Sequence, residues 1–205
     1  MKFVLASASP ARLAVLRAAG IDASVVVSGV DEDAVAASLS DPSPAELVTE
    51  LAKAKANAVA GEITGDAVVV GCDSMLSIGG DVVGKPGTPE VARKRWAAMA
   101  GGSGELLTGH AVIRLGASPA TAAGCRATTV RFASPSEDEL ETYLATGEPL
   151  AVAGAFTLDG LGGWFVEGVD GDPSSVIGIS LPLTRQLLAQ VGLSVTDFWR
   201  TDPTL

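Results

Sequence analysis

The sequence is poor in the residues that many metal and nucleophile sites require, since its 205 residues include one His and two Cys. A single His, His110, nearly excludes a histidine-based metal site and a Ser-His-Asp triad, and we interpret it as structural. Cys72 and Cys125 have no zinc-type spacing and are too few for a disulfide scaffold. This cysteine usage favours a reduced compartment, so we expect a cytoplasmic protein.

Positive charge and long apolar runs are also scarce. Lys and Arg number 14 against 24 Asp and Glu, which gives a formal net charge of −10. Nucleic acids and anionic membranes are bound by basic surfaces, so we expect neither as a partner. No apolar run approaches the roughly 18 residues of a membrane helix. A small polyanion remains a reasonable ligand, because a few converging cations can bind one against an acidic background.

The sequence does have a sizeable apolar content, 47%, with 19% charged residues, which indicates an ordered core in one domain. Apolar periodicity, caps and turn residues predict an α/β fold with a mixed sheet. Residues 147–173 are Gly-rich and irregular, and such a long connection is often functional. The expected strands are residues 2–6, 24–27, 67–72, 106–115 and 127–132, with a hairpin of 75–78 and 82–83. The expected helices are residues 10–19, 43–60, 88–101, 136–145 and 182–191.

The most informative segment is a β-branched run that is interrupted by Gly71 and then by Asp73. We expect Asp73 at the carboxyl end of a buried strand, where open α/β sheets bind ligands. Lys85 follows twelve residues later and precedes Pro86, which favours an extended backbone at the lysine. A fixed carboxylate and a fixed cation near each other suit metal-assisted chemistry on a phosphate. The alternative is an aspartate that only caps a turn.

A second candidate is the segment from Ser7 to Arg12, where a strand, a turn with hydroxyls and a helix N-terminus follow one another. Free backbone N–H groups and the helix dipole favour an anion at such a place. Ser7, Ser9 and Arg12 would then contact phosphate, with Arg12 able to bind it through two donors. The alternative is an ordinary helix cap with a surface arginine.

Two further charged sites are ambiguous by sequence. Glu32 lies in an acidic run that either complements a helix dipole or lets one carboxylate share a metal with Asp73. Lys53 and Lys55 lie on different faces of one expected helix, so at most one enters a cleft.

Together these pieces resemble the Maf family of nucleoside triphosphate pyrophosphatases. The family pattern has S-x-S-P-R-R, an acidic residue, L-A-x-x-K-A, a G-A-D-T-like strand end and G-K-P. Later come T-G, then G-E-P with A-G-A-[YF], and finally G-D-x-x-x-V-x-G-[LI]-[PS]. The corresponding segments, in the same order over almost the whole chain, are Ser7–Arg12, Glu32, Leu51–Ala56, Gly71–Ser74, Gly84–Pro86, Thr108–Gly109, Gly147–Phe156 and Gly171–Ile179.

The resemblance implies an elongated twisted mixed sheet flanked by helices, with two lobes around a central cleft. It implies a cytoplasmic hydrolase that cleaves a nucleoside triphosphate between the α and β phosphates, giving the monophosphate and pyrophosphate. It further implies a divalent cation, Mg²⁺ or Mn²⁺, and a homodimer. The family is regarded as removing unwanted or modified nucleotides and is linked to septum formation in cell division.

Residue by residue, Asp73 matches the catalytic aspartate of the family and Glu32 its acidic partner. Lys55 matches the helix lysine, Lys85 the G-K-P lysine and Arg12 the second arginine of the first motif. By this resemblance the cations bind phosphates, while Asp73 and Glu32 hold the metal. Either carboxylate could take the proton from water, and the sequence does not separate metal ligand from general base for Asp73.

The chain departs from the family pattern at positions linked to base choice. Ala11 replaces the first arginine, Ser74 replaces a threonine and Asp159 corresponds to the glutamine of the branch that prefers dTTP and UTP. Val152 stands where a lysine is common. A carboxylate lacks the donor of an amide, so we expect no standard dTTP and UTP preference.

Two other functions remain open by sequence. One is a non-catalytic nucleotide-binding regulator of division. The replacement of basic family residues by Ala11 and Val152 favours this function. The other is a nucleotidyltransferase, since a G-K-P segment after a strand-end aspartate is not unique to hydrolases.

Overall fold

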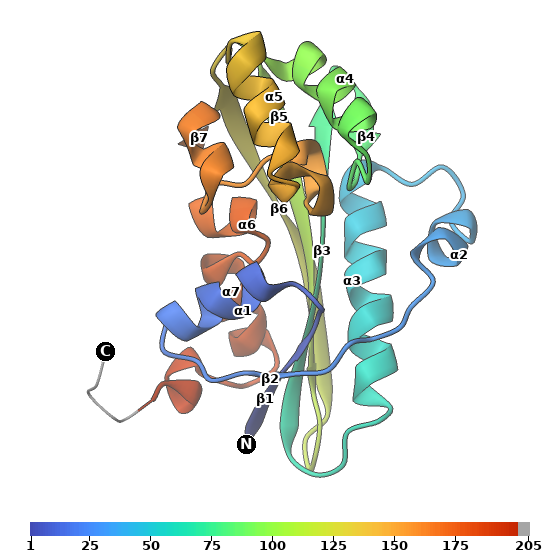
Figure 1. Ribbon diagram of the computed structural model, residues 1–205. Coiled ribbons are helices and arrows are strands. Elements are labelled where there is room, and N and C mark those ends of the chain that lie inside the picture. The colour runs from blue at the N-terminus through green and yellow to red at the C-terminus, as the bar shows by residue number, and fades with distance from the viewer. Residues whose placement is uncertain (201–205) are drawn as a thin grey trace. The chain divides into compact units, whose positions relative to one another are not determined.

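The computed structural model describes residues 1–200, and its strands form one seven-stranded sheet in the order β2-β1-β3-β5-β6-β7, with β4 paired to β3 (Figure 1). β1 is parallel to β2 and β3, whereas β4 is antiparallel to β3 and β7 is antiparallel to β6. The predicted mixed sheet is therefore confirmed. The strands are β1 (Lys2–Ala6), β2 (Ser24–Val25), β3 (Ala67–Ile78), β4 (Asp81–Val83), β5 (Ser103–Arg114), β6 (Ala120–Phe132) and β7 (Val166–Asp170).

The main helices begin at caps that are visible in the sequence. Ser43 and Ser136 each form a capping box with the glutamate three residues later, and Pro10 opens α1. None of the described helices is long and apolar enough to cross a membrane. The α-helices are α1 (Pro10–Ala18), α2 (Glu32–Ala37), α3 (Pro44–Ala60), α4 (Pro89–Met99), α5 (Glu137–Ala145), α6 (Pro173–Ile177) and α7 (Leu181–Gln190). Short 3₁₀ helices are η1 (Glu148–Ala151), η2 (Ala153–Ala155), η3 (Leu161–Phe165) and η4 (Val195–Phe198).

The predicted hairpin of residues 75–78 and 82–83 is confirmed, since Leu76–Ile78 pair with Asp81–Val83. The predicted end of the preceding strand at Cys72 was wrong, because β3 continues without a break through Asp73 to Ile78. β7 and α2 were not predicted either, because Gly-rich or acidic segments carry little apolar periodicity.

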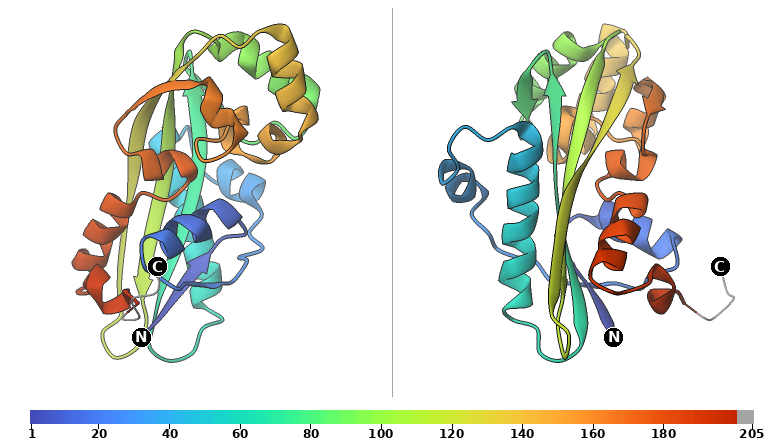
Figure 2. Two further views of the ribbon diagram at one scale, coloured as in Figure 1. Left: turned by 60° about the vertical axis from the view of Figure 1, so that its left-hand side comes forward. Right: turned by 180° about the vertical axis from the view of Figure 1, so that it is seen from behind.

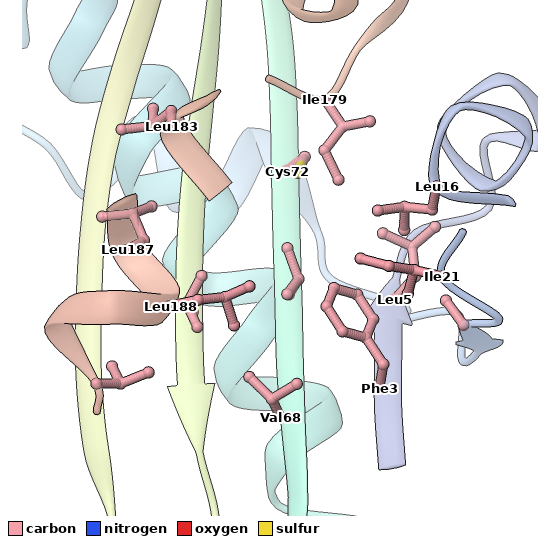
Figure 3. Close-up of a cluster of buried hydrophobic side chains, with 14 of the residues drawn as sticks. Phe3, Leu5, Leu16, Ile21, Val68, Cys72, Ile179, Leu183, Leu187 and Leu188 are labelled. Atoms are coloured by element: carbon pink, nitrogen blue, oxygen red, sulfur yellow. The ribbon is translucent and has the colours of Figure 1, made fainter. Parts of the chain in front are cut away.

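Residues of the chain contact one another mainly within two compact units. The first comprises residues 1–73 and 108–126 together with the described residues from Gly178 onward. Within it, α3 covers one face of the sheet and α1 and α7 cover the other (Figure 2). Residues alternate between these faces along each strand, so Val68 and Val70 pack toward α1 and α7 while Val69 packs toward α3. Figure 3 shows side chains from β1, β3, α1 and α7 in the core on the face of the sheet that α1 and α7 cover.

The second unit comprises residues 74–107 and 127–177 and has its own core. Trp96 of α4 is fully buried there and makes edge-on contacts with Phe132, Tyr143 and Phe165. Its indole N–H donates to the carbonyl of Ala155 at 2.9 Å. The chain has few aromatic residues, and several of them pack together in this core.

Candidate active site

Asp73 lies in the middle of β3 and is 6% exposed. The parallel pairing of β1 with β3 ends at Ala6 opposite Gly71, so Asp73 lies just beyond the end of its neighbouring strand. Because strand residues alternate, Asp73 is on the same face as Gly71, the face that α3 covers. A Cβ atom at Gly71 would lie 2.3 Å from the carbonyl oxygen of Ala52, so only glycine lets α3 approach this closely. That approach brings a lysine of α3 to Asp73.

Lys55 is this lysine, and its ammonium group lies between two carboxylates. Its Nζ atom is 2.6 Å from Oδ1 of Asp73 and 2.7 Å from Oε1 of Glu32. The side chain of Lys55 is 10% exposed, whereas that of Glu32, at the start of α2, is 53% exposed. Lys53 instead pairs with Glu50 at the surface. The prediction that the two lysines lie on different helix faces is confirmed.

Burial raises the pKa of the Asp73 carboxyl above its ordinary value. The charge and hydrogen bond of Lys55, and the charge of Arg12, act in the opposite direction. Glu32 adds a further upward contribution, and the net shift in the Asp73 pKa is upward. Burial also raises the pKa of Cys72, next to Asp73, to about 11, so its thiol stays protonated and is a poor nucleophile.

The loop between β1 and α1 is ordered by its own hydroxyl groups. Ser9 caps α1 by accepting from the backbone N–H of Arg12, and the Ser7 hydroxyl accepts from the N–H of Ser9 at 3.2 Å. The Arg12 guanidinium donates to Oγ of Ser7 at 2.9 Å and to the carbonyl of Gly178 at 2.7 Å. Arg12 is therefore held at the start of α1, and Ala11 beside it is half-buried. The structure brings Ser7, Ser9 and Arg12 together as the sequence predicted.

Three other predicted residues belong to the second unit. Lys85 is exposed and lies between half-buried Gly84 and buried Pro86. Ser74 directly follows Asp73 in β3 and is half-buried. Asp159 is exposed in the segment that connects η2 to η3.

The sequence-based reasoning missed Glu148, which organises the segment that carries Asp159. Its carboxylate accepts hydrogen bonds from the hydroxyls of Thr157 at 2.5 Å and Tyr143 at 3.2 Å. It also accepts from the backbone N–H groups of Leu161 and Gly162, both at 3.1 Å. Partial burial alone would raise the pKa of Glu148, but these hydrogen bonds outweigh burial and lower it. The G-E-P motif was the only sequence signal for this residue.

His110 has a structural place, as the sequence suggested. Its ring is buried in β5, with Nδ1 3.0 Å from the carbonyl oxygen of Thr108. Its Nε2 accepts from the backbone N–H of Ser180, the residue that caps α7, at 2.8 Å. The imidazole thus connects a central strand to a helix of the first unit.

Metal-ligating side chains are few at this site. Among residues 1–200 no group of three or more His, Cys, Asp and Glu side chains is arranged to hold a metal ion. Asp73 and Glu32 are nevertheless two carboxylates that converge on one point, the Lys55 ammonium. Oxygen ligands of this kind suit Mg²⁺ when water and substrate complete the coordination.

Comparison with known proteins shows the family of this chain. The family described as Maf-like protein matches residues 2–191. The chain belongs to the Maf family. A Maf relative from Saccharopolyspora erythraea is 68% identical over 97% of each chain, and one from Nocardia farcinica is 66% identical over 96% of each. A third, from Mycolicibacterium gilvum, is 57% identical over 97% of this chain and 98% of its own. All three are named nucleoside triphosphate pyrophosphatase.

Proposed function

We propose that this Maf-family chain is a nucleoside triphosphate pyrophosphatase that hydrolyses the bond between the α and β phosphates. The names of its close relatives support this reaction. The observation that carries the proposal is the buried Lys55 ammonium between Asp73 and Glu32, which gathers two acids and a cation at one point. Hydrolysis of a polyphosphate requires both charge neutralisation and a positioned water molecule.

In the proposed reaction the carboxylates act on water. The oxygen of water bonds to the α-phosphorus, the bond from that phosphorus to the oxygen bridging to the β phosphate breaks, and pyrophosphate leaves with that oxygen. A carboxylate of Asp73 or Glu32 accepts the proton that water releases. Asp73 suits this role because burial raises its pKa above the ordinary value, which strengthens it as a base.

Cations are proposed to bind the phosphates. Lys55 and Arg12 supply positive charge in the first unit, together with the hydroxyls of Ser7 and Ser9 and the N-terminus of α1. Lys85 of the second unit is proposed as a further phosphate contact. Its assignment comes from the family resemblance.

We also propose that a divalent cation, Mg²⁺ or Mn²⁺, assists the reaction. Asp73 and Glu32 would hold it, since both lie at the Lys55 ammonium and each provides hard oxygen ligands. When bound, the cation would neutralise charge on the phosphates. The homodimer and the link to septum formation stay predictions from the resemblance.

The proposed substrates include modified nucleotides. We also propose that the chain lacks the preference for dTTP and UTP, which in the family goes with a glutamine at the position of Asp159. Ala11, Ser74 and Asp159 together replace the residues linked to that preference. A hundredfold preference of about 2.7 kcal/mol for dTTP and UTP over purine nucleotides would contradict this proposal.

The test is an assay of the purified protein with Mg²⁺ and a panel of canonical and modified nucleoside triphosphates, in which pyrophosphate and orthophosphate are both measured. We expect pyrophosphate and monophosphate in equal amounts. Asp73→Asn and Glu32→Gln should each lower kcat by at least about a hundredfold. Asp33→Asn is the matched control, because Asp33 is an exposed neighbour of Glu32.

Each other outcome has a defined meaning. Orthophosphate as the only product would show a γ-phosphatase, and transfer of the monophosphate to an acceptor would show a nucleotidyltransferase. Nucleotide binding without turnover would support the regulator. Near-normal turnover by Asp73→Asn would contradict the role given to Asp73.

A further inference from the structure

The loop that carries Lys85 is held by backbone contacts on one side. The Gly84 carbonyl accepts from the backbone N–H of Gly154 at 3.3 Å, and the N–H of Gly87 donates to the carbonyl of Leu150 at 3.2 Å. Residues 84–87 are therefore fixed to the segment of η1 and η2. Lys85 itself remains exposed on this fixed loop.

Arg95 of α4 holds the same loop from another element. Its guanidinium donates to the carbonyl of Gly84 and, at 3.5 Å, to the carbonyl of Lys85. The Gly84 carbonyl therefore accepts two hydrogen bonds, which uses both of its lone pairs. The two residues of the loop that precede Pro86 are both bound by one arginine side chain.

The charge of Arg95 is not neutralised by an acid. Among residues 1–200, no carboxylate lies within ion-pair distance of this guanidinium. Arg93, two residues earlier on α4, instead forms a two-point ion pair with Glu141 at 2.6 and 2.7 Å. Partial burial lowers the pKa of Arg95, but an arginine stays protonated in proteins. An un-neutralised positive charge is thus bonded to the Lys85 loop in a chain whose net charge is −10.

A half-buried, unneutralised guanidinium is an expensive way to hold two carbonyls, because a neutral donor would suffice without the cost of desolvating a charge. The charge is useful when an anion binds at the loop. We propose that Arg95 is a positioning residue for polyphosphate binding, which fixes the backbone of Gly84 and Lys85 and adds its positive charge to that of Lys85. This inference rests on the proposed function, which assigns Lys85 a phosphate contact.

The experiment compares Arg95→Met, Arg95→Lys and the control Arg93→Met in the full chain. Binding of inorganic pyrophosphate is measured by calorimetry, and kcat and KM are measured for a good nucleotide substrate. Arg95→Met should raise the pyrophosphate Kd and the KM by about tenfold, or about 1.4 kcal/mol, while kcat changes by less than about twofold. Arg95→Lys keeps the charge and should recover at least half of that loss on a logarithmic scale. Arg93→Met should leave Kd and KM unchanged.

Two results would overturn the inference. One is Arg95→Met with normal Kd and KM, whatever its melting temperature. The other is a rise in KM that Arg95→Lys does not reduce, since that would assign the effect to the packing of arginine alone. If Arg95→Met does not fold, Arg95→Lys against Arg95→Gln makes the same comparison of charge. If the wild-type chain binds pyrophosphate in an Arg95-dependent way but hydrolyses no nucleotide, the proposed function fails and the inference stands.

Discussion

Lys55 stabilises the ionised form of Asp73 although the carboxyl is buried. Burial and the charge of Glu32 raise the pKa of Asp73, and the ammonium group of Lys55 opposes that rise. We therefore expect Lys55→Met to raise the pKa of Asp73 further. The measurement is a pH titration of the Asp73 carboxyl by ¹³C NMR, which does not depend on activity.

Lys53→Met is the matched control, because Lys53 is on the same helix but pairs with Glu50 at the surface. The sign of the linkage gives a second readout. The folded-state pKa of Asp73 is raised, so its contribution to stability is present below the unfolded pKa of about 3.9 and is lost as pH rises through the folded value. Lys55→Met should therefore lose more stability than Lys53→Met as the pH rises above about 4. Equal titration curves in the two variants would contradict the role given to Lys55.

Helical periodicity predicted that Lys53 and Lys55 lie on different helix faces, and the family resemblance indicated which of the two belongs to the site. The sequence left open whether Glu32 and Asp73 act together or Glu32 only complements a helix dipole, since their shared contact with Lys55 depends on the tertiary fold. Arg95 had no sequence signal at all. Its function in the structure depends on two carbonyl groups, which no side-chain pattern reveals.

Among the elements, α3 is the one whose placement the site depends on most. It meets the sheet through glycines of two strands, since a Cβ atom at Gly71 of β3 would lie 2.3 Å from Ala52 O and one at Gly109 of β5 would lie 2.1 Å from Val48 O. Both contacts are with helix backbone, which cannot rotate away. Any added atom must move α3, and Lys55 with it.

We expect Gly71→Ala to lower the free energy of unfolding by about 1–3 kcal/mol, the usual range for overpacking. The measurement is urea denaturation. Gly124→Ala is the control, because a Cβ atom there would lie 3.6 Å from the nearest atom of Leu183, an ordinary contact. A Gly71→Ala protein as stable as Gly124→Ala would show that α3 does not require this close approach.

Elements with strong local signals were predicted well and those set by pairing were not. Capping boxes and proline placed α3 and α5 almost to the residue, since these signals act within one turn. The hairpin of β3 and β4 was predicted from its turn residues, but the unbroken passage of β3 through Asp73 was not, because glycine and aspartate are depleted in strands. β7 is similar, since it is defined by its pairing with β6.

For the whole molecule, the net charge of −10 leads to a prediction about macromolecular partners. Nonspecific binding of nucleic acid requires several cations that neutralise phosphates, and this chain has an excess of acids. We expect no binding of a labelled 20-base-pair DNA or RNA duplex at about 50 mM salt up to about 0.1 mM protein, measured by fluorescence anisotropy. Saturable binding that weakens steeply with salt would contradict this expectation.

The first unit is assembled from three separate stretches of chain, and this has a consequence for synthesis. Its core joins Phe3 and Leu5, which leave the ribosome early, to Leu187 and Leu188 of α7, which leave it late. The second unit lies wholly within residues 74–177, so all its parts are available sooner. During translation the apolar side chains of β1 therefore stay exposed until α7 has been synthesised. A message truncated before α7 would yield a chain with this apolar surface exposed, which chaperones and proteases recognise.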